Sequence, residues 1–237
     1  YQCELTQVSV GSGLQTIGES AFFKNTNLAR FIVPTSDATN NLRSIGKSAF
    51  YGLWMLSFPF VHCPRLETIG DHAFEFTSHG EHEGRLTLPP SVKYIGEAAF
   101  MANQGLQVVY IPDDAKVTVL KKHALAGCAL LTALEGFKSI QELEEGVFIE
   151  TGLTGKFKLP ANVAKMGPGV FKRAGSLTEI EWNNKMTEIP DETFFACDRL
   201  IKLPKNIEKV TKIGNSAFEL CANFVGLNED DAIIIPN

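Results

Sequence analysis

The chain has 237 residues, of which 44% are hydrophobic and 21% are charged, and its formal net charge at pH 7 is −5. These values are typical of a soluble globular protein that is long enough to bury a large core, in one long domain or two short ones. Basic and acidic residues are mixed along the whole length, so the sequence lacks the basic surface of a nucleic-acid-binding protein. No apolar run approaches the roughly 18 residues of a membrane-spanning helix.

One short phrase recurs along the chain. It first reads Ile17-Gly18-x-x-Ala21-Phe22, and it returns at steps of 23 to 28 residues. Its last residue falls at positions 22, 50, 74, 100, 125, 148, 171, 194 and 218. A unit of this size cannot bury its own apolar face, so stacked units are expected to share one continuous core. A column of phenylalanine rings along that core explains why the chain has 17 Phe but only 4 Tyr.

The elements within one unit follow in a fixed order. A run such as Phe31-Ile32-Val33-Pro34 alternates in polarity, which predicts a short strand that ends at proline. The glycine of the phrase indicates either a positive φ angle or a close approach of two backbones. The x-x-Ala-Phe segment favours a single helical or 3₁₀ turn, with Phe pointing into the core.

Four positions depart from the pattern in the middle and later units. Lys121, Glu144 and Pro190 replace the glycine, and Leu125 replaces the phenylalanine. At these positions we expect looser packing, not a different fold.

The unit resembles that of the BspA-like (Treponema pallidum-type) leucine-rich repeat family, L-x-x-I-x-I-P-x-x-V-x-x-I-G-x-x-A-F-x-x-C/N-x-x-L. The resemblance runs from about Leu5 to Pro236. It implies an α/β leucine-rich-repeat solenoid, a right-handed superhelix with a short strand and a short helix or 3₁₀ turn in each repeat. We therefore expect residues 1–237 to form a single solenoid of about nine repeats, as a fragment of a longer array. The strand-like sequences at both ends, beginning at Gln2 and at Ile233, have no capping element beside them.

The outward positions of the predicted long strands form the candidate ligand-binding surface, because strand residues alternate between the core and solvent. The candidates are Arg30, Ile32, Arg85, Val108, Tyr110, Lys156, Lys158, Glu179, Glu181 and Lys202. The alternative is an ordinary solvated sheet face. A second apolar region, from Trp54 to Phe60, is interpreted either as a packed insertion or as a contact site.

The polar residues do not suggest catalysis. His79 and His82 are weak metal-ligand candidates in a connecting loop, and no metal or other cofactor is expected. Cys128, Cys197 and Cys221 occupy a repeated interior position and are predicted to be free thiols, whereas Cys3 and Cys63 are expected to be exposed. No catalytic motif stands out, so an enzyme is the least favoured class.

The sequence therefore predicts a noncatalytic recognition or adhesion module that binds a protein or glycan ligand, but neither nucleic acid nor the membrane interior. The family resemblance implies an extracellular or cell-surface protein, and the residues are equally compatible with an intracellular one. The alternative function is a structural or scaffold subunit that associates end to end, or with flanking repeats, through its uncapped ends.

Overall fold

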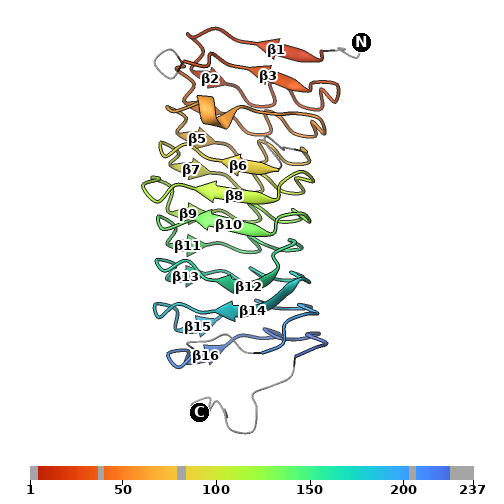
Figure 1. Ribbon diagram of the computed structural model, residues 1–237, viewed down its shortest axis with the longest axis vertical. Coiled ribbons are helices and arrows are strands. Elements are labelled where there is room, and N and C mark those ends of the chain that lie inside the picture. Colours follow the sequence, from red (N-terminus) through yellow and green to blue (C-terminus); the bar gives the residue numbers. More distant parts are fainter. Residues whose placement is uncertain (1–4, 37–39, 79–83, 203–206, 225–237) are drawn as a thin grey trace.

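The computed structural model describes residues 5–36, 40–78, 84–202 and 207–224 as a stack of coils with two rows of parallel strands (Figure 1). The long strands are β1 (Gln7–Ser9), β3 (Arg30–Ile32), β6 (Arg85–Thr87), β8 (Val108–Ile111), β10 (Ala133–Gly136), β12 (Gly155–Lys158) and β14 (Leu177–Glu181). The short strands are β2 (Thr16–Ile17), β4 (Ser44–Ile45), β5 (Thr68–Ile69), β7 (Tyr94–Ile95), β9 (Val119–Leu120), β11 (Glu142–Leu143), β13 (Lys165–Met166), β15 (Glu188–Ile189) and β16 (Lys212–Ile213).

The repeats stack in register. Ile17 of the first recurring phrase pairs with Ile45, Ile45 pairs with Ile69, and Ile69 pairs with Ile95, all in parallel. Hydrogen bonding divides the long strands into the groups β1–β3, β6–β8–β10 and β12–β14, and the short strands into β2–β4–β5–β7, β9–β11–β13 and β15–β16. Equivalent side chains therefore lie above one another along the stack.

The predicted helical turn is wrong, and the fold is corrected from α/β to a parallel β-solenoid. Among the described residues the one helix is η1 (Phe60–His62), a 3₁₀ turn in the irregular part of the second repeat. The Gly-x-x-Ala-Phe segments instead form consecutive tight turns, which make the third side of the solenoid.

Hydrogen bonds between repeats explain why these turns are not helical. The backbone N–H groups of Ser48, Phe50 and Gly52 donate to carbonyl oxygens of the next repeat over 2.9, 2.8 and 2.9 Å. The intervening Ala49 and Tyr51 bond within the turn. Ser48 and Gly52 adopt φ angles of 51° and 76°, which direct alternate N–H groups along the stack. Because each of these groups is satisfied by a neighbouring repeat, the stack compensates for the unfavourable left-handed backbone.

The recurring glycine is explained by the close approach of two backbones. A Cβ atom placed on Gly46, Gly70 or Gly96 would lie only 2.7, 2.6 or 2.4 Å from a backbone nitrogen of the preceding repeat. None of the three has a positive φ angle. Two of the replacements, Lys121 and Glu144, reach outward and form an ion pair with Nζ and Oε1 2.7 Å apart.

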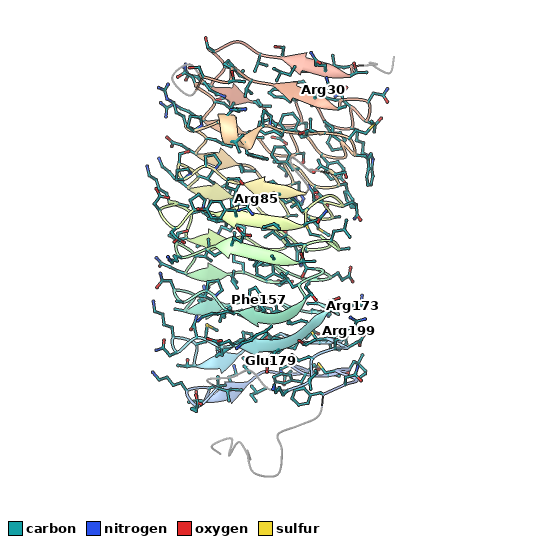
Figure 2. All side chains as sticks on the ribbon, viewed as in Figure 1. Arg30, Arg85, Phe157, Arg173, Glu179 and Arg199 are labelled. Atoms are coloured by element: carbon teal, nitrogen blue, oxygen red, sulfur yellow. The ribbon has the colours of Figure 1, made fainter. Side chains whose placement is uncertain are left out.

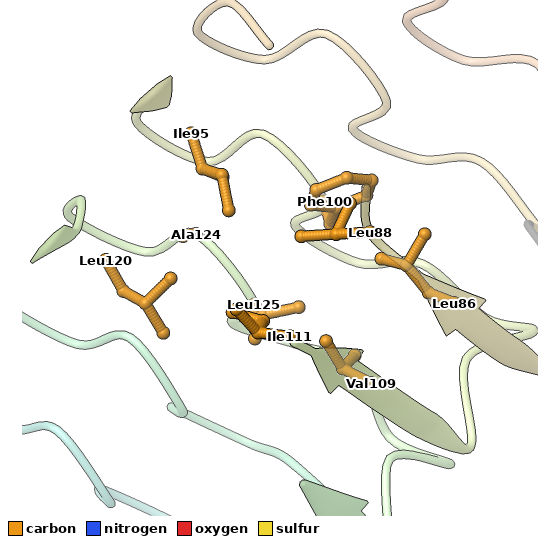
Figure 3. A pocket seen from close by; sticks show the side chains of 9 residues that line it. All are labelled: Leu86, Leu88, Ile95, Phe100, Val109, Ile111, Leu120, Ala124 and Leu125. Atoms are coloured by element: carbon orange, nitrogen blue, oxygen red, sulfur yellow. The ribbon is translucent and has the colours of Figure 1, made fainter. Parts of the chain in front are cut away.

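The phenylalanine column is present and has one gap. Ring centroids are 5.3 Å apart between Phe22 and Phe50, 5.1 Å between Phe50 and Phe74, and 5.5 Å between Phe74 and Phe100. Leu125 interrupts the column, and beside it lies an apolar cavity of about 10 Å³ (Figure 3). The cavity lies at one of the four departures from the pattern, and looser packing at Glu144 and Pro190 stays a prediction.

The described cysteines are free thiols, and three of them share one repeated position. The Sγ atoms of Cys128, Cys197 and Cys221 donate to the carbonyl oxygens of Phe100, Phe171 and Phe194 over 3.2, 3.0 and 3.1 Å. Each thiol therefore ties its turn to the preceding repeat. The expectation that Cys63 is exposed was wrong, because it is fully buried. Cys3 lies outside the described residues.

The two predicted uncapped ends fall mostly outside the described residues. The run that begins at Gln2 is described only from residue 5 onward, and residues 233–236 lie outside the described ranges. Association through the ends therefore stays a prediction.

Candidate ligand-binding surface

The long strands present the candidate residues on one side of the solenoid, as their alternation predicts. In β3 the flanking Arg30 and Ile32 are exposed, while Phe31 between them is buried. In β8, Val108 and Tyr110 are partly exposed, while Val109 and Ile111 are buried. Figure 2 shows Arg30, Arg85 and Glu179 following one another down the long strands. We call this side the long-strand face.

A first group of side chains meets on β6, β8 and β10. Arg85 is paired with Val108 across one strand boundary, and Tyr110 is paired with Glu135 across the next. The Arg85 guanidinium lies 5.3 Å from the Tyr110 ring centroid, and its Nη2 atom is 2.7 Å from Glu135 Oε2. This hydrogen bond with Arg85 holds the pKa of the Glu135 carboxyl below its usual range. The tyrosine is thus covered by an ion pair that spans three strands.

Glu135 was missed by the sequence prediction. The run Leu131-Thr132-Ala133-Leu134-Glu135 lacks the terminal proline of the other strand segments, so its outward residues were not included. Alignment on Leu131, which corresponds to Leu106 of the preceding repeat, places Glu135 beside Tyr110. The spacing between repeats was therefore a better guide than the Pro terminator.

A second group lies on and beside β12 and β14 and consists of Lys156, Lys158, Glu179, Glu181 and Lys202. Lys156 Nζ and Lys158 Nζ each lie 3.1 Å from a carboxylate oxygen of Glu181. Lys202 Nζ lies 2.7 Å from Glu179 Oε1. Hydrogen bonds from Lys156 and then Lys158 lower the pKa of Glu181. We call these five residues the charged group.

The two remaining candidates stand apart from both groups. Arg30 and Ile32 pair with Gln7 and Ser9 of β1, and Arg30 forms an isolated parallel bridge with Ser57. Ile32 is 40% exposed. The structure therefore places all ten candidates along one face but divides them into separate patches.

The side of the short strands carries its own ion pairs, which the sequence prediction did not consider. Glu67 lies between Arg43 and Lys93, at 3.1 and 2.6 Å. Further along, Lys165 Nζ lies 2.6 Å from Glu142 Oε1. Regular charge pairing is thus a property of both strand faces and does not by itself identify a binding surface.

The described residues contain no group of three or more His, Cys, Asp or Glu side chains that could hold a metal ion. His79 and His82 lie outside the described residues. His72 is close to a single carboxylate, with its Nδ1 atom 2.5 Å from Glu75 Oε2.

The apolar run after Gly52 is partly packed in the core and partly exposed, so each of the two interpretations made from the sequence, a packed insertion and a contact site, fits one part of it. Leu56, Phe58 and Phe60 are buried in the core. Trp54 and Met55 are 50% and 66% exposed on the side formed by the tight turns. Packing therefore accounts for the second half of the run but not for the first.

Comparisons with known proteins agree with the geometry. The family model described as "BspA type Leucine rich repeat region (6 copies)" matches residues 1–131 and 114–225. Among curated proteins, none matches the sequence significantly. In the described residues there is no helix long and apolar enough to cross a membrane.

Two solved structures are similar in fold. A leucine-rich repeat protein from Bacteroides ovatus is 23% identical with a TM-score of 0.61, over 94% of this chain and 66% of that one. The pneumococcal vaccine antigen PcpA is 16% identical with a TM-score of 0.52, over 97% of this chain and 59% of that one. The present chain thus spans less than two thirds of the length of either relative.

Proposed function

Because the chain belongs to the BspA-type leucine-rich repeat family, we propose that it is a noncatalytic recognition or adhesion module that binds a protein or glycan through the long-strand face. The observation that carries the proposal is the regular stacking of outward side chains from successive repeats. Such a stack gives an extended surface, which repeat proteins use for recognition.

We place the centre of this surface at the charged group, because it is the largest cluster that the ten candidate residues form. It brings three ammonium groups and two carboxylates together on neighbouring segments of the long-strand face. Surface ion pairs of this kind add only about 0–1 kcal/mol to stability. A ligand with complementary charges can therefore replace them at little cost to the fold and gain specificity and association rate.

The test combines a binding screen with a pair of matched variants. Wild-type protein is applied to immobilised panels of matrix proteins and glycans, and each ligand found is then measured with Lys158→Glu and Lys165→Glu. Both lysine side chains are 73% exposed and both are ion-paired, but they lie on opposite strand faces.

We expect Lys158→Glu to weaken binding by about tenfold and Lys165→Glu to leave it nearly unchanged. Equal losses in the two variants would contradict a specific role for the long-strand face. A panel without any bound component would contradict the adhesion function itself.

The location of the protein follows from the same proposal. An adhesive module acts where its ligand is, so we propose an extracellular or cell-surface location, in keeping with the family resemblance. Detection of the protein on intact source cells by a surface-restricted label tests this, and labelling seen only after cell lysis would contradict it.

A further inference from the structure

The tight-turn side of the first three repeats carries a groove that neither strand face includes. It has a volume of about 380 Å³ and is lined by Lys24, Thr26, Tyr51, Gly52, Trp54 and Phe76. We call it the turn groove. Because it lies away from the long-strand face, the inference below does not depend on the function proposed above.

Repeat stacking explains why the groove exists. Lys24, Gly52 and Phe76 occupy the same position in successive repeats, as shown by the bonds from Lys24 N to Tyr51 O and from Gly52 N to Glu75 O. Gly52 has a φ angle of 76° and no side chain, so a space opens between Lys24 and Phe76.

Aromatic rings form one wall of the space. The Trp54 ring centroid lies 6.1 Å from that of Phe76, and Phe76 meets Tyr51 edge to face at 5.6 Å. Tyr51 in turn stacks on Phe23 at 5.0 Å. The Trp54 and Phe76 planes are inclined by 45°, and those of Phe76 and Tyr51 by 74°, so the rings form an angled apolar wall rather than a flat platform. Trp54 and Phe23 are 50% and 42% exposed, so this apolar surface is open to solvent.

The lining of the groove carries positive charge only. Lys24 is the one charged residue in the lining, and its Nζ atom lies 5.2 Å from the Phe23 ring centroid. It takes part in no ion pair among the described residues. The nearby Glu75 is buried and faces His72, so it does not neutralise Lys24. A bound molecule therefore meets an ammonium group held over the Phe23 ring, and the hydroxyl-bearing residues Thr26 and Tyr51 also belong to the lining.

We propose that the turn groove binds an acidic oligosaccharide, with one sugar ring lying on the exposed Trp54 ring and a carboxylate directed to Lys24. The C–H face of a pyranose is apolar and slightly positive, and it complements the negative face of an aromatic ring. The sugar hydroxyls remain at the open side, where water and the polar rim satisfy them. A carboxylate beside an ammonium group gains a charge-assisted hydrogen bond.

A proline-rich peptide is the principal competing occupant, because such peptides also bind aromatic surfaces. An uncharged proline-rich segment gains nothing from Lys24, which is the one charged residue in the lining. The ammonium group therefore favours an acidic sugar over a proline-rich segment.

Trp54 itself provides the measurement. The chain has two tryptophans, and Trp182 is 1% exposed, so acrylamide quenching of fluorescence reports mainly on Trp54. Quenching is measured while titrating the full chain with a hexasaccharide of alternating glucuronic acid and N-acetylglucosamine. A neutral N-acetylglucosamine hexasaccharide and a proline-rich peptide serve as comparison ligands.

We expect the acidic hexasaccharide to protect Trp54 in a saturable way, with an affinity about two- to fivefold higher than that of the neutral one. Lys24→Gln should remove this difference while leaving neutral binding unchanged. By calorimetry, Trp54→Ala should weaken both glycans by about tenfold or more. Met55→Ala is the matched control, because Met55 is exposed next to Trp54 but does not line the groove.

Three results would overturn the proposal. One is the absence of saturable binding of either glycan at millimolar concentration. Another is a loss in Met55→Ala as large as that in Trp54→Ala. The third is saturable, Trp54-dependent binding of the proline-rich peptide without glycan binding, which would make the groove a peptide site.

Discussion

The phenylalanine column is regular on both sides of Leu125 and is interrupted at Leu125 itself. On both sides the rings follow one another at 5.1 to 5.7 Å, from Phe22 to Phe100 and from Phe148 to Phe218. At Leu125 the aromatic stack is interrupted and a cavity is left. The backbone hydrogen bonding between repeats is unchanged there. Leu125 N donates to Val147 O over 3.2 Å, just as Phe100 N donates to Ala124 O over 3.0 Å.

The comparison separates two sources of stability in the solenoid. Hydrogen bonds between repeats set the spacing and tolerate a change of core side chain. Ring stacking adds packing free energy only where consecutive repeats all supply an aromatic residue. If this is correct, substitutions in the column and in the backbone ladder should have separable effects.

The largest effect is expected from removing a ring inside the uninterrupted column. Phe74 is fully buried and stacks between Phe50 and Phe100. We expect Phe74→Ala to lower the free energy of unfolding by about 3–5 kcal/mol, measured by urea denaturation. Leu125→Ala should cost less, about 2–3 kcal/mol, because the cavity there already exists and a leucine has fewer contacts to lose. Equal losses would show that the ring stack adds nothing beyond burial.

A smaller effect is expected from a methyl group at the stacking glycine. In Gly70→Ala the new Cβ would lie 2.6 Å from Lys47 N, so the two repeats must move apart, at a cost of about 1–3 kcal/mol. Gly18→Ala is the control, because no atom lies within 4 Å of a Cβ at that position, and its effect should stay within about 0.5 kcal/mol. A similar loss in both variants would refute the close-approach explanation.

Filling the gap in the column should stabilise the protein modestly. Leu125→Phe restores an aromatic neighbour for Phe100 and Phe148 and fills apolar space, so we expect a gain of about 1 kcal/mol in the same urea measurement. A loss of stability would show that the surrounding core has closed around leucine and is overpacked by the ring.

The smallest effect is expected in the alkylation rates of two buried thiols, which should hardly differ. Burial raises the pKa of Cys128, in the Leu125 repeat, to about 12, and that of Cys197, in an uninterrupted repeat, to about 12. Both should therefore react with an alkylating reagent at pH 8 about a thousandfold more slowly than an ordinary thiol, and at similar rates. Much faster labelling of Cys128, located by peptide mass spectrometry, would show that the cavity loosens its repeat.

The same pKa shifts make the stability of the folded chain depend on pH. Below pH 9 the thiols are protonated in both the folded and the unfolded chain, and their contribution is constant. Between pH 9 and about 12 the unfolded chain releases protons that the folded chain retains, so stability should fall as the pH rises through this window. Cys128→Ser and Cys197→Ser together should reduce this slope, which denaturation at a series of pH values would measure.

Much of this organisation could be predicted from the sequence, because the period of the repeat can be measured directly from the recurring residues. The spacing of the phenylalanines predicted the core column, and the departure at Leu125 predicted where packing would be looser. Alternation in the strand segments placed Arg30, Tyr110 and Lys158 on the outward side. These inferences depend on which residues are apolar and on their spacing, both of which are local properties of the chain.

Only the tertiary structure decided how the segment after Ile-Gly is folded and which surfaces come together. Isolated, Gly46 to Phe50 is compatible with a helical turn, but neighbouring repeats accept its N–H groups and hold Ser48 in a left-handed conformation. The turn groove likewise requires Lys24, Gly52, Trp54 and Phe76 from three repeats to lie side by side. Spacing along the chain fixes what a single repeat can bury, whereas contacts between repeats determine what the stacked surface can bind.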